Sequence, residues 1–484
     1  MFSENILCSF FSVGNLAIFY LSALSLFVCS KSHLIRYVAK YTFHFIRSKY
    51  HRLRGDHVVF VKGKSPDVRG KMWDRIYITS LFSFHWNETV QTIRYYGRSV
   101  SRPDYIYVGG ILATLMADEL KEELNPTLPV TIIKGLLDEP GMLDQGSSQI
   151  IEEMIPNYAI LDDIDYTYGV EDAYLGYATR GCVKKCSFCA VRTLEPQPKY
   201  RCQYHTSIPN LVHSIDTIYG PKKDLLLLDN NILASPDYER IIHEILDAGF
   251  EKDATFNRKQ RRLDFNQGID ARLVTPMKMK LLAKTAIKPL RLAFDHSRMR
   301  IGYEKAVRLA CKYGMSRHST YILFNYNDTP EDFYSRLRIN INLNEELDAK
   351  ISSFPMKFIP LTSKNRRHIG KHWHRKMIRG VQCILLATKG MVSPRREFFD
   401  AAFGRNEREF REICMMPEDY IIYRQRHADK ADEWRKLYHR IGLRQHQRLL
   451  ELLAQGRIKE EHCRPETGLL RRLLEHYIES EDVG

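Results

Sequence analysis

Short apolar runs alternate with amphipathic stretches through the middle of the chain. Between residues 166 and 361, apolar runs predict buried strands at Ala173–Thr179, Leu225–Asp229, Phe265–Gly268, Leu290–Phe294, Tyr321–Asn325 and Lys357–Pro360. Apolar residues spaced three or four apart predict helices at Tyr238–Ala248, Met277–Thr285, Tyr303–Tyr313 and Pro330–Ile339. Strands and helices that alternate in this way predict a parallel sheet.

Residues 55 to 165 carry a second, separate α/β pattern. Strands are expected at His57–Val61, Arg75–Thr79, Tyr105–Val108, Val130–Ile133 and Ala159–Leu161, with helices between them. Gly109 and Gly110 follow the third strand and precede an apolar helix expected at Ile111–Leu120. A glycine pair at this point lets a ligand approach the backbone at the strand ends of an open sheet, and it equally permits tight packing of a helix on the sheet.

The first 54 residues follow neither pattern. Residues 6 to 30 form a run of 25 residues without a charge, which is long enough for a helix to cross a membrane. Basic residues follow directly and would keep the rest of the chain on the cytoplasmic side of such an anchor. Six Ser or Asn residues in the run weaken this interpretation and leave a buried or disordered extension open, and Glu4 argues against a cleaved signal peptide. We therefore expect a cytoplasmic protein, with or without an N-terminal anchor.

After Pro360 the chain becomes helical and rich in arginine. Apolar spacing predicts helices around Arg435–Tyr438, Gln447–Ala454 and Leu469–Tyr477. The phenylalanines between residues 398 and 410 are expected to pack in a core. The sequence thus predicts four parts, which are a leader at 1–54, an α/β domain at 55–165, a second α/β domain at 166–361 and a helical domain at 362–484.

The net charge of +15 is concentrated in two segments. Residues 1–60 carry seven basic and two acidic residues, residues 61–360 carry 40 and 38, and residues 361–396 carry ten and none. Cations clustered near the aromatic ring of Trp373 can hold phosphates and stack on a base, so the segment 364–396 predicts an interface with nucleic acid or another polyanion. A solvated helical face explains the same run of charges.

Three of the ten cysteines are grouped at CxxxCxxC spacing. Cys182, Cys186 and Cys189 lie in the sequence Arg-Gly-Cys-Val-Lys-Lys-Cys-Ser-Phe-Cys-Ala. Three thiolates so close in sequence can wrap one metal centre, and three ligands on a cubane of four irons leave one iron open to a small molecule. The alternative is a zinc knuckle that takes Cys202 or His205 as its fourth ligand.

This segment resembles the radical S-adenosylmethionine (SAM) enzymes, whose signature is CxxxCxxC with an aromatic residue, here Phe188, before the last cysteine. The resemblance implies that the three cysteines hold a 4Fe-4S cluster, that SAM chelates the open iron, and that its reductive cleavage gives a 5'-deoxyadenosyl radical. Phe188 would lie near the adenine. The family also implies a partial TIM barrel of six β/α units with its site at the C-terminal strand ends. Six strands are expected between residues 166 and 361, which matches that barrel.

The same resemblance assigns SAM contacts to polar residues that follow the expected strands. Asp229 and Asn231 follow the second strand, where many family members carry a Gly-Gly-Glu type motif that receives the SAM amino group. This sequence departs from that motif, although a carboxylate and an amide also accept hydrogen bonds from an ammonium group. Gln267, Asp270 and Arg272 follow the third strand and would suit the ribose hydroxyls and the SAM carboxylate.

Asn325 and Asp328 follow the fifth strand and resemble the family's loop near the adenine. Asp328 and the three residues after it are also typical of the N-terminus of a helix, with a capping residue, a proline and early acidic residues. The sequence leaves both interpretations open.

Residues 55–165 look similar to the Rossmann-like cobalamin-binding domain found in many radical SAM enzymes. The usual Asp-x-His-x-x-Gly motif for the lower cobalt ligand is absent from the sequence. The opening strand and Gly-rich turn expected before residue 50 are also missing, because the apolar leader stands in their place. The resemblance therefore suggests cobalamin as a cofactor, and these two departures argue against it.

The leading hypothesis is a radical SAM enzyme of unidentified substrate. It would have a Rossmann-like domain, a partial (β/α)6 TIM barrel and a mostly helical C-terminal domain, and a flavodoxin- or ferredoxin-type protein would supply its electrons. Methylthiotransferases are disfavoured because they carry a second cluster on N-terminal cysteines, and no cysteine lies between residues 30 and 181. The rival hypothesis is a non-catalytic iron-sulfur or zinc protein that binds nucleic acid or another polyanion.

Overall fold

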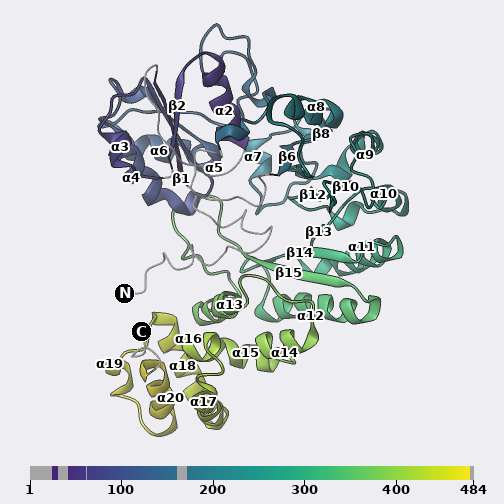
Figure 1. Cartoon of the computed structure of the whole chain (residues 1–484). Helices are drawn as coiled ribbons and strands as arrows, with labels where there is room; N and C mark the ends of the chain where they lie inside the picture. The colour runs from purple at the N-terminus through teal and green to yellow at the C-terminus, as the bar shows by residue number, and fades with distance from the viewer. Residues whose placement is uncertain (1–23, 31–41, 62, 161–171, 480–484) are drawn as a thin grey trace. The chain divides into compact units, whose positions relative to one another are not determined.

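The computed structural model describes residues 24–30, 42–61, 63–160 and 172–479 (Figure 1). The chain divides into two compact units. The first comprises Met1–Arg291 with Pro360–Arg367, and the second comprises Leu292–Ile359 with His368–Gly484. The structure is a mixed α/β fold with parallel strands and many helices, which confirms the predicted fold class at that level. The partial (β/α)6 barrel and the division into four domains remain predictions.

The first unit contains a five-stranded sheet. Its strands are β1 (Leu24–Ser30), β2 (His57–Val61), β3 (Arg75–Ser80), β4 (Ile106–Gly109) and β5 (Thr131–Ile132), in the order β2-β1-β3-β4-β5. Strands β3, β4 and β5 are parallel, whereas β1 is antiparallel to both of its neighbours. A strand therefore does precede residue 50, contrary to the sequence-based expectation. It comes from the apolar leader and runs against the direction of a Rossmann-like sheet.

Helices pack on this sheet around an apolar core. They are α2 (Thr42–Leu53), α3 (Pro66–Arg69), α4 (Trp86–Tyr96), α5 (Gly110–Leu115) and α6 (Ala117–Leu124). The predicted helix at residues 111–120 is therefore two helices that meet at Met116. Gly110 has a φ of 90°, and a Cβ there would lie 2.7 Å from the backbone oxygen of Ser80. Tight packing of α5 against β3 thus accounts for Gly110.

A parallel three-stranded sheet completes the first unit. It consists of β6 (Ala173–Gly176), β9 (Asp224–Leu227) and β12 (Leu263–Phe265), in the order β12-β9-β6. Two short hairpins accompany it, β7 (Thr179–Gly181) with β8 (Arg201–Tyr204) and β10 (Thr255–Phe256) with β11 (Lys259–Gln260). Its helices are α7 (Val191–Leu194), α8 (Ile208–Tyr219), α9 (Tyr238–Asp247) and α10 (Pro276–Leu282). The first two strands predicted for the core are present, the first of them interrupted between β6 and β7. The third prediction, Phe265–Gly268, was wrong in position, because β12 ends at Phe265.

A further sheet has the order β13-β14-β15. Its strands are β13 (Leu290–Ala293), which lies at the division between the units, β14 (Arg317–Phe324) and β15 (Lys350–Lys357), and β14 and β15 are parallel. The strand predicted at Lys357–Pro360 was wrong in position, because β15 ends where that prediction began. Pro355 lies within β15, and because β15 is an edge strand its missing N–H is tolerated.

The rest of the second unit is helical (Figure 1). Its helices are α11 (Arg300–Lys312), α12 (Pro330–Leu347), α13 (Arg375–Ala387), α14 (Arg396–Phe403), α15 (Glu407–Met415), α16 (Glu418–Ile422), α17 (Ala428–Arg440), α18 (Leu443–Gln455), α19 (Glu460–Cys463) and α20 (Gly468–Glu479). Phe399, Phe403 and Phe410 are fully buried and lie near one another, as predicted, whereas Phe398 is 41% exposed.

Two other expectations concern the ends of the first α/β pattern. The strand expected at Ala159–Leu161 was wrong, because Tyr158–Ile160 form a 3-10 helix and Leu161 lies outside the described residues. In the apolar leader, residues 24–30 form β1, and residues 6–23 lie outside the described residues. Within the described ranges, no helix combines the length and the apolar character needed to cross a membrane.

Candidate metal and cofactor site

The three cysteines of the motif lie on one loop that leaves the end of a strand. Cys182 follows β7 directly, and the loop ends at α7, two residues after Cys189. Cys182, Cys186 and Cys189 are all partly exposed, as is Phe188. Gly181 has a φ of 87°, and a Cβ there would come within 2.4 Å of the Tyr200 backbone. Only glycine therefore lets β7 pair with β8 at the point where the loop begins.

A buried ion-pair network joins the two ends of this loop. Arg180, which is 3% exposed, precedes the first cysteine by two residues, and its Nη1 donates to Glu195 Oε1 at 3.0 Å. Its Nη2 donates to Glu152 Oε2 at 2.6 Å. Glu195 lies just after α7, and its other oxygen accepts hydrogen bonds from the Gly181 N–H and, at 2.8 Å, from Asn230 Nδ2. Breaking a buried ion pair leaves an uncompensated charge and is costly. The network therefore holds the two ends of the cysteine loop in one arrangement.

The Cys182 thiol accepts hydrogen bonds from the backbone and from a side chain. Its Sγ accepts from the backbone N–H of Lys184 at 3.4 Å and from Asn231 Nδ2 at 3.6 Å. The thiol of Cys202 lies beside it, within reach of Cys182 and 3.3 Å from the Gly181 carbonyl oxygen. A hydrogen bond from Cys202, helped by those from Lys184 and Asn231, lowers the pKa of Cys182 to about 6 even though burial opposes the shift. The site therefore favours the thiolate, the form that binds metal.

Cys202 and His205 were the two side chains considered as a fourth zinc ligand. Cys202 is fully buried next to Cys182. For His205, burial and the nearby charge of Arg180 lower the pKa to about 4. In the described ranges, no three His, Cys, Asp or Glu side chains converge on one point as the ligands of a single ion would. A cubane places each cysteine on a different iron, so its ligands need no common point of convergence.

Residues after β9 reach the cysteine loop. Asp229 is 1% exposed, and its carboxylate accepts from the backbone N–H of Ala178 at 3.0 Å and from the N–H and hydroxyl of Thr179, each at 2.6 Å. It thereby fixes the turn between β6 and β7. Burial raises the pKa of Asp229 to about 6 despite these hydrogen bonds. Asn231 is 3% exposed, and its Oδ1 has no hydrogen-bond partner in the described part of the chain.

Residues after β12 also reach the cysteine loop. Gln267 is exposed, whereas the carboxylate of Asp270 accepts from Arg272 Nε at 2.7 Å and from Arg272 Nη2 at 2.8 Å. The pKa of the Arg272 guanidinium is raised, first by Asp270 and then by a hydrogen bond with Cys186. Asp270 in turn opposes ionisation of Cys182. The structure therefore brings Asn231, Asp270 and Arg272 near the cysteines. Their role as SAM contacts stays a prediction.

Asn325 and Asp328 lie in the second unit, where the chain itself uses their polar atoms. Asn325 is fully buried. Its Nδ2 donates to the carbonyl oxygens of Phe358 and His368, at 3.0 and 3.2 Å, and its Oδ1 accepts from the Gly370 N–H at 2.7 Å. Asp328 accepts from Trp373 Nε1 at 3.2 Å and from the buried Arg336 at 2.7 Å. Its neighbour Thr329 caps α12, so the alternative of a helix N-terminus is confirmed.

The basic segment 364–396 is not one continuous free cationic surface. In the first unit, Lys364 Nζ lies 3.9 Å from the ring centroid of Trp86 and Arg366 Cζ lies 4.9 Å from that of Phe84. In the second unit, Lys376 is buried and bonded to the carbonyl oxygen of Met416. The ion pairs of this segment are Arg379–Glu418 and Arg396–Glu345. These contacts leave the predicted nucleic-acid interface without support from the structure.

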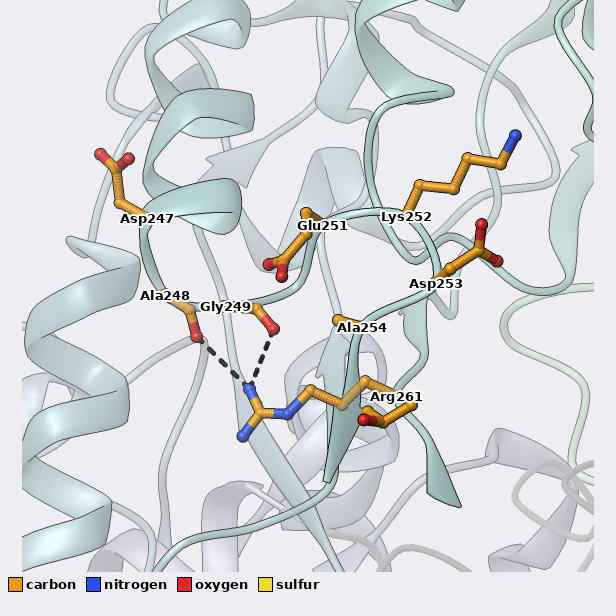
Figure 2. A pocket seen from close by; sticks show the side chains of 9 residues that line it. Asp247, Ala248, Gly249, Glu251, Lys252, Asp253, Ala254 and Arg261 are labelled. Atoms are coloured by element: carbon orange, nitrogen blue, oxygen red, sulfur yellow. Dashed lines mark hydrogen bonds between the residues drawn. The ribbon is translucent and has the colours of Figure 1, made fainter. Parts of the chain in front are cut away.

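A surface hollow of about 640 Å³ lies away from the cysteines, at the C-terminal end of α9 (Figure 2). Arg261 crosses it and donates to the carbonyl oxygens of Ala248 and Gly249, at 3.4 and 3.2 Å. Arg261 precedes β12, whereas the candidate site residues follow β9 and β12. In a parallel sheet, residues that precede a strand and residues that follow it lie at opposite ends of the strands. The hollow is therefore not part of the candidate site.

Sequence reasoning missed Arg180, Glu195 and Glu152. The available signal was that Arg180 and Glu195 flank the cysteine motif. Arginine and glutamate are seldom buried unless they are paired, so the sequence offered no reason to place them in a core. Cys202 was considered only as a zinc ligand, and its place beside Cys182 depends on the pairing of β7 with β8.

No known protein family and no curated protein sequence matches the chain. Among solved structures, the chain is similar to TsrM of Kitasatospora setae, described as a radical SAM methyltransferase with cobalamin and a 4Fe-4S cluster bound. The identity is 15% over 72% of this chain and 74% of TsrM, with a TM-score of 0.43. It is also similar to SuiB of Streptococcus suis bound to SAM, with 11% identity over 45% of this chain and 48% of SuiB and a TM-score of 0.31.

SuiB bound to its precursor peptide SuiA gives 11% identity over 58% of this chain and 61% of SuiB, with a TM-score of 0.31. The chain therefore spans about half of the length of SuiB in these two matches.

Proposed function

We propose that this protein is a radical SAM enzyme in which Cys182, Cys186 and Cys189 hold a 4Fe-4S cluster. One observation carries the proposal. The three partly exposed thiols of the CxxxCxxC loop meet polar residues from the ends of two neighbouring parallel strands, Asn231 after β9 and Arg272 after β12. A site at the C-terminal ends of parallel strands is where such folds bind ligands.

The residues present fit both cofactors. Thiolates are the ligands that iron-sulfur clusters use, and the hydrogen bonds to Cys182 favour its thiolate. The buried Oδ1 of Asn231, which lacks a partner among the described residues, can accept a hydrogen bond from the ammonium group of SAM. When bound, the cluster would supply the electron for reductive cleavage of SAM, and the radical product of SAM would act on the substrate.

The chain's own residues would bind and orient the cofactors. Asn231 donates to the Cys182 thiol through Nδ2 and would offer Oδ1 to SAM. Arg272, held by Asp270, would face the SAM carboxylate, and Phe188 would cover the adenine. Asp229 would act indirectly, because its carboxylate is occupied in holding residues 178 and 179, which lead into the cysteine loop.

The proposal is tested by anaerobic reconstitution of the protein with iron and sulfide, followed by dithionite and SAM. We expect a brown protein that releases 5'-deoxyadenosine. Cys186→Ala should lose the chromophore, whereas Cys311→Ala, at another partly exposed cysteine, should keep it. A fully loaded cluster that yields no 5'-deoxyadenosine would overturn the enzyme assignment, and a colourless protein with stoichiometric zinc would support the rival hypothesis.

We also propose cobalamin as a further cofactor, which would bind at the C-terminal ends of β3, β4 and β5. Parallel strands in an open sheet bind ligands at that edge. The antiparallel β1 and the packing role of Gly110 depart from the expected cobalamin-binding domain. Retention of cobalamin by the purified protein on a desalting column tests this part, and complete loss of the corrinoid absorbance would remove cobalamin from the proposed function.

A further inference from the structure

A buried chain of hydrogen bonds lies on one face of the five-stranded sheet. Tyr77 is in β3 between Ile76 and Ile78, so its side chain points to the face opposite the apolar core that contains those two residues. Tyr77 is fully buried, and His51, in α2, is 2% exposed. The His51 Nδ1 lies 2.8 Å from Asp56 Oδ2, and its Nε2 lies 3.0 Å from the Tyr77 hydroxyl oxygen. A carboxylate, an imidazole and a phenol are therefore joined in one row.

The chemistry of these three groups determines where their protons lie. Burial lowers the pKa of His51, although Asp56 opposes the shift, so the imidazole is neutral at pH 7. A carboxylate can only accept, so Nδ1 carries the ring proton and donates to Asp56. Nε2 is then an acceptor, and the Tyr77 hydroxyl donates to it. Tyr77 is thus a phenol whose proton already points at a base.

A second tyrosine stacks on this phenol. The ring centroid of Tyr107, in β4, lies 5.0 Å from that of Tyr77, and the two ring planes differ by 23°. Tyr107 is partly exposed, and its hydroxyl makes no hydrogen bond within the described residues. Arg75, which pairs with Asp144, donates to the Tyr77 oxygen at 3.5 Å and so helps to direct the Tyr77 proton toward His51. The two stacked rings therefore differ in one respect, since Tyr77 has a base beside it and Tyr107 has none.

We propose that Tyr77 is a redox-active tyrosine that stores one oxidising equivalent as a neutral radical, with His51 as its proton acceptor and Tyr107 as its electron relay to the surface. The inference goes beyond the proposed function and does not depend on a cluster at the cysteines. A phenol becomes strongly acidic when it loses an electron, so a phenol within hydrogen-bond reach of a base is oxidised more easily than one without. The oxidising equivalent therefore settles on Tyr77 rather than on Tyr107.

The step moves one electron and one proton. The oxidant is of the class of oxygen-centred radicals, such as a peroxyl radical, which takes one electron through Tyr107 and becomes its anion. Tyr77 loses that electron, its O–H bond breaks, and the proton forms an N–H bond at His51 Nε2. The resulting imidazolium is stabilised by Asp56. A one-electron donor such as ascorbate returns the electron, and the proton on His51 then restores the phenol.

The test generates the radical in the full-length protein without added iron. A photoexcited ruthenium tris-bipyridine complex with a sacrificial electron acceptor stands in for the oxidant, and transient absorption and EPR follow the tyrosyl radical. Tyr77→Phe removes the proposed site. The matched control is Tyr96→Phe, at another fully buried tyrosine of the first unit. The Tyr96 hydroxyl donates to the Gly63 carbonyl oxygen at 3.0 Å and accepts from the Ser65 N–H at 2.6 Å, so it bonds to backbone groups that cannot take up a proton.

We expect Tyr77→Phe to lose most of the long-lived tyrosyl signal and Tyr96→Phe to keep it. His51→Gln leaves a hydrogen-bond acceptor beside the phenol but removes the base, so the radical should form about a hundredfold more slowly. Tyr107→Phe should slow formation of the radical and leave its final EPR spectrum unchanged. Equal yields and lifetimes in Tyr77→Phe and Tyr96→Phe would overturn the proposal, as would a His51→Gln protein that forms the radical at the wild-type rate.

A nearly isosteric substitution decides the question if these variants fail to fold. Incorporation of 3-fluorotyrosine at position 77 alone keeps the hydroxyl and its hydrogen bond to His51. A radical on that ring shows the hyperfine splitting of fluorine in its EPR spectrum, and we expect this splitting in the long-lived signal. A long-lived tyrosyl signal without fluorine splitting would place the radical elsewhere and overturn the assignment to Tyr77.

Discussion

Asn231 Nδ2 lies 3.6 Å from Cys182 Sγ, and the other polar atom of the same amide, Oδ1, has no hydrogen-bond partner among the described residues. The buried amide of Asn231 thus contacts the proposed cluster ligand Cys182 through Nδ2, and its Oδ1 can still accept a hydrogen bond. A buried acceptor without a partner is costly, so Asn231 Oδ1 fits the proposed hydrogen bond from SAM.

Replacement of Asn231 by Ala should weaken SAM binding more than cluster assembly. A hydrogen bond to a charged group contributes about 1.5 to 3 kcal/mol, so the Kd for SAM should rise about tenfold to a hundredfold. Isothermal titration of the reconstituted protein measures this, with iron content as the check on assembly. Asn210→Ala, at an exposed position on α8, should leave the Kd unchanged. An Asn231→Ala protein that binds SAM as tightly as the wild type would remove this contact.

Removal of the Arg180 side chain should destabilise the first unit. Arg180→Met leaves Glu152 and Glu195 as buried carboxylates without their cation, and breaking a buried pair costs about 3 to 5 kcal/mol. Thermal unfolding and hydrogen exchange around residues 180–195 measure the loss. The control, Arg308→Met, breaks the exposed pair with Glu346 and should cost less than about 1 kcal/mol. Similar losses in the two variants would contradict the special role of the buried network.

The stability of the first unit should fall in mild acid because of His85. Burial, and secondarily the charge of Arg366, lowers the pKa of His85 to about 4 in the folded protein. Between that pH and the ordinary pKa of about 6.5, the unfolded chain binds a proton that the folded chain excludes. Stability is therefore retained above about pH 6.5 and lost progressively as the pH falls toward 4.

Denaturant unfolding at pH 7 and pH 5 checks this dependence on His85. His85→Gln should reduce the loss of stability between the two pH values. His372→Gln, at an exposed position, should leave it as in the wild type. If His85→Gln and the wild type lose equal stability, another group controls the acid sensitivity.

Gly110→Ala tests whether the glycine pair after β4 serves packing. A Cβ at Gly110 would meet the Ser80 carbonyl oxygen at 2.7 Å on a backbone with a φ of 90°, so the variant should be destabilised by more than about 1 kcal/mol. Gly302, in α11, has open space around its Cβ position, and Gly302→Ala should be neutral or stabilising by up to about 1 kcal/mol. Chemical denaturation of both variants makes the comparison. A fully stable Gly110→Ala protein would point instead to a ligand at this turn.

Local pattern was sufficient for much of the secondary structure. Apolar runs and apolar residues three or four apart located β2, β9, β13 and α9 to within one or two residues. In these elements the apolar positions of the sequence are the positions that become buried. It failed at β1 and β15. An apolar leader and a segment containing Pro355 look unlike strands until a neighbouring strand supplies their backbone hydrogen bonds.

The sequence by itself determined the three cysteines and the polar residues after the strands as candidates, because metal ligands on one loop must be close in the chain. Only the tertiary structure decided which of those candidates meet. Asn231, Asp270 and Arg272 reach the thiols because parallel strands end at one edge, whereas Asp229, Asn325 and Asp328 are engaged by backbone groups and buried side chains. The Arg180–Glu195 pair and the position of Cys202 beside Gly181 likewise depend on chain pairing, since residues 15 to 21 positions apart become partners only when β7 and β8 fold together.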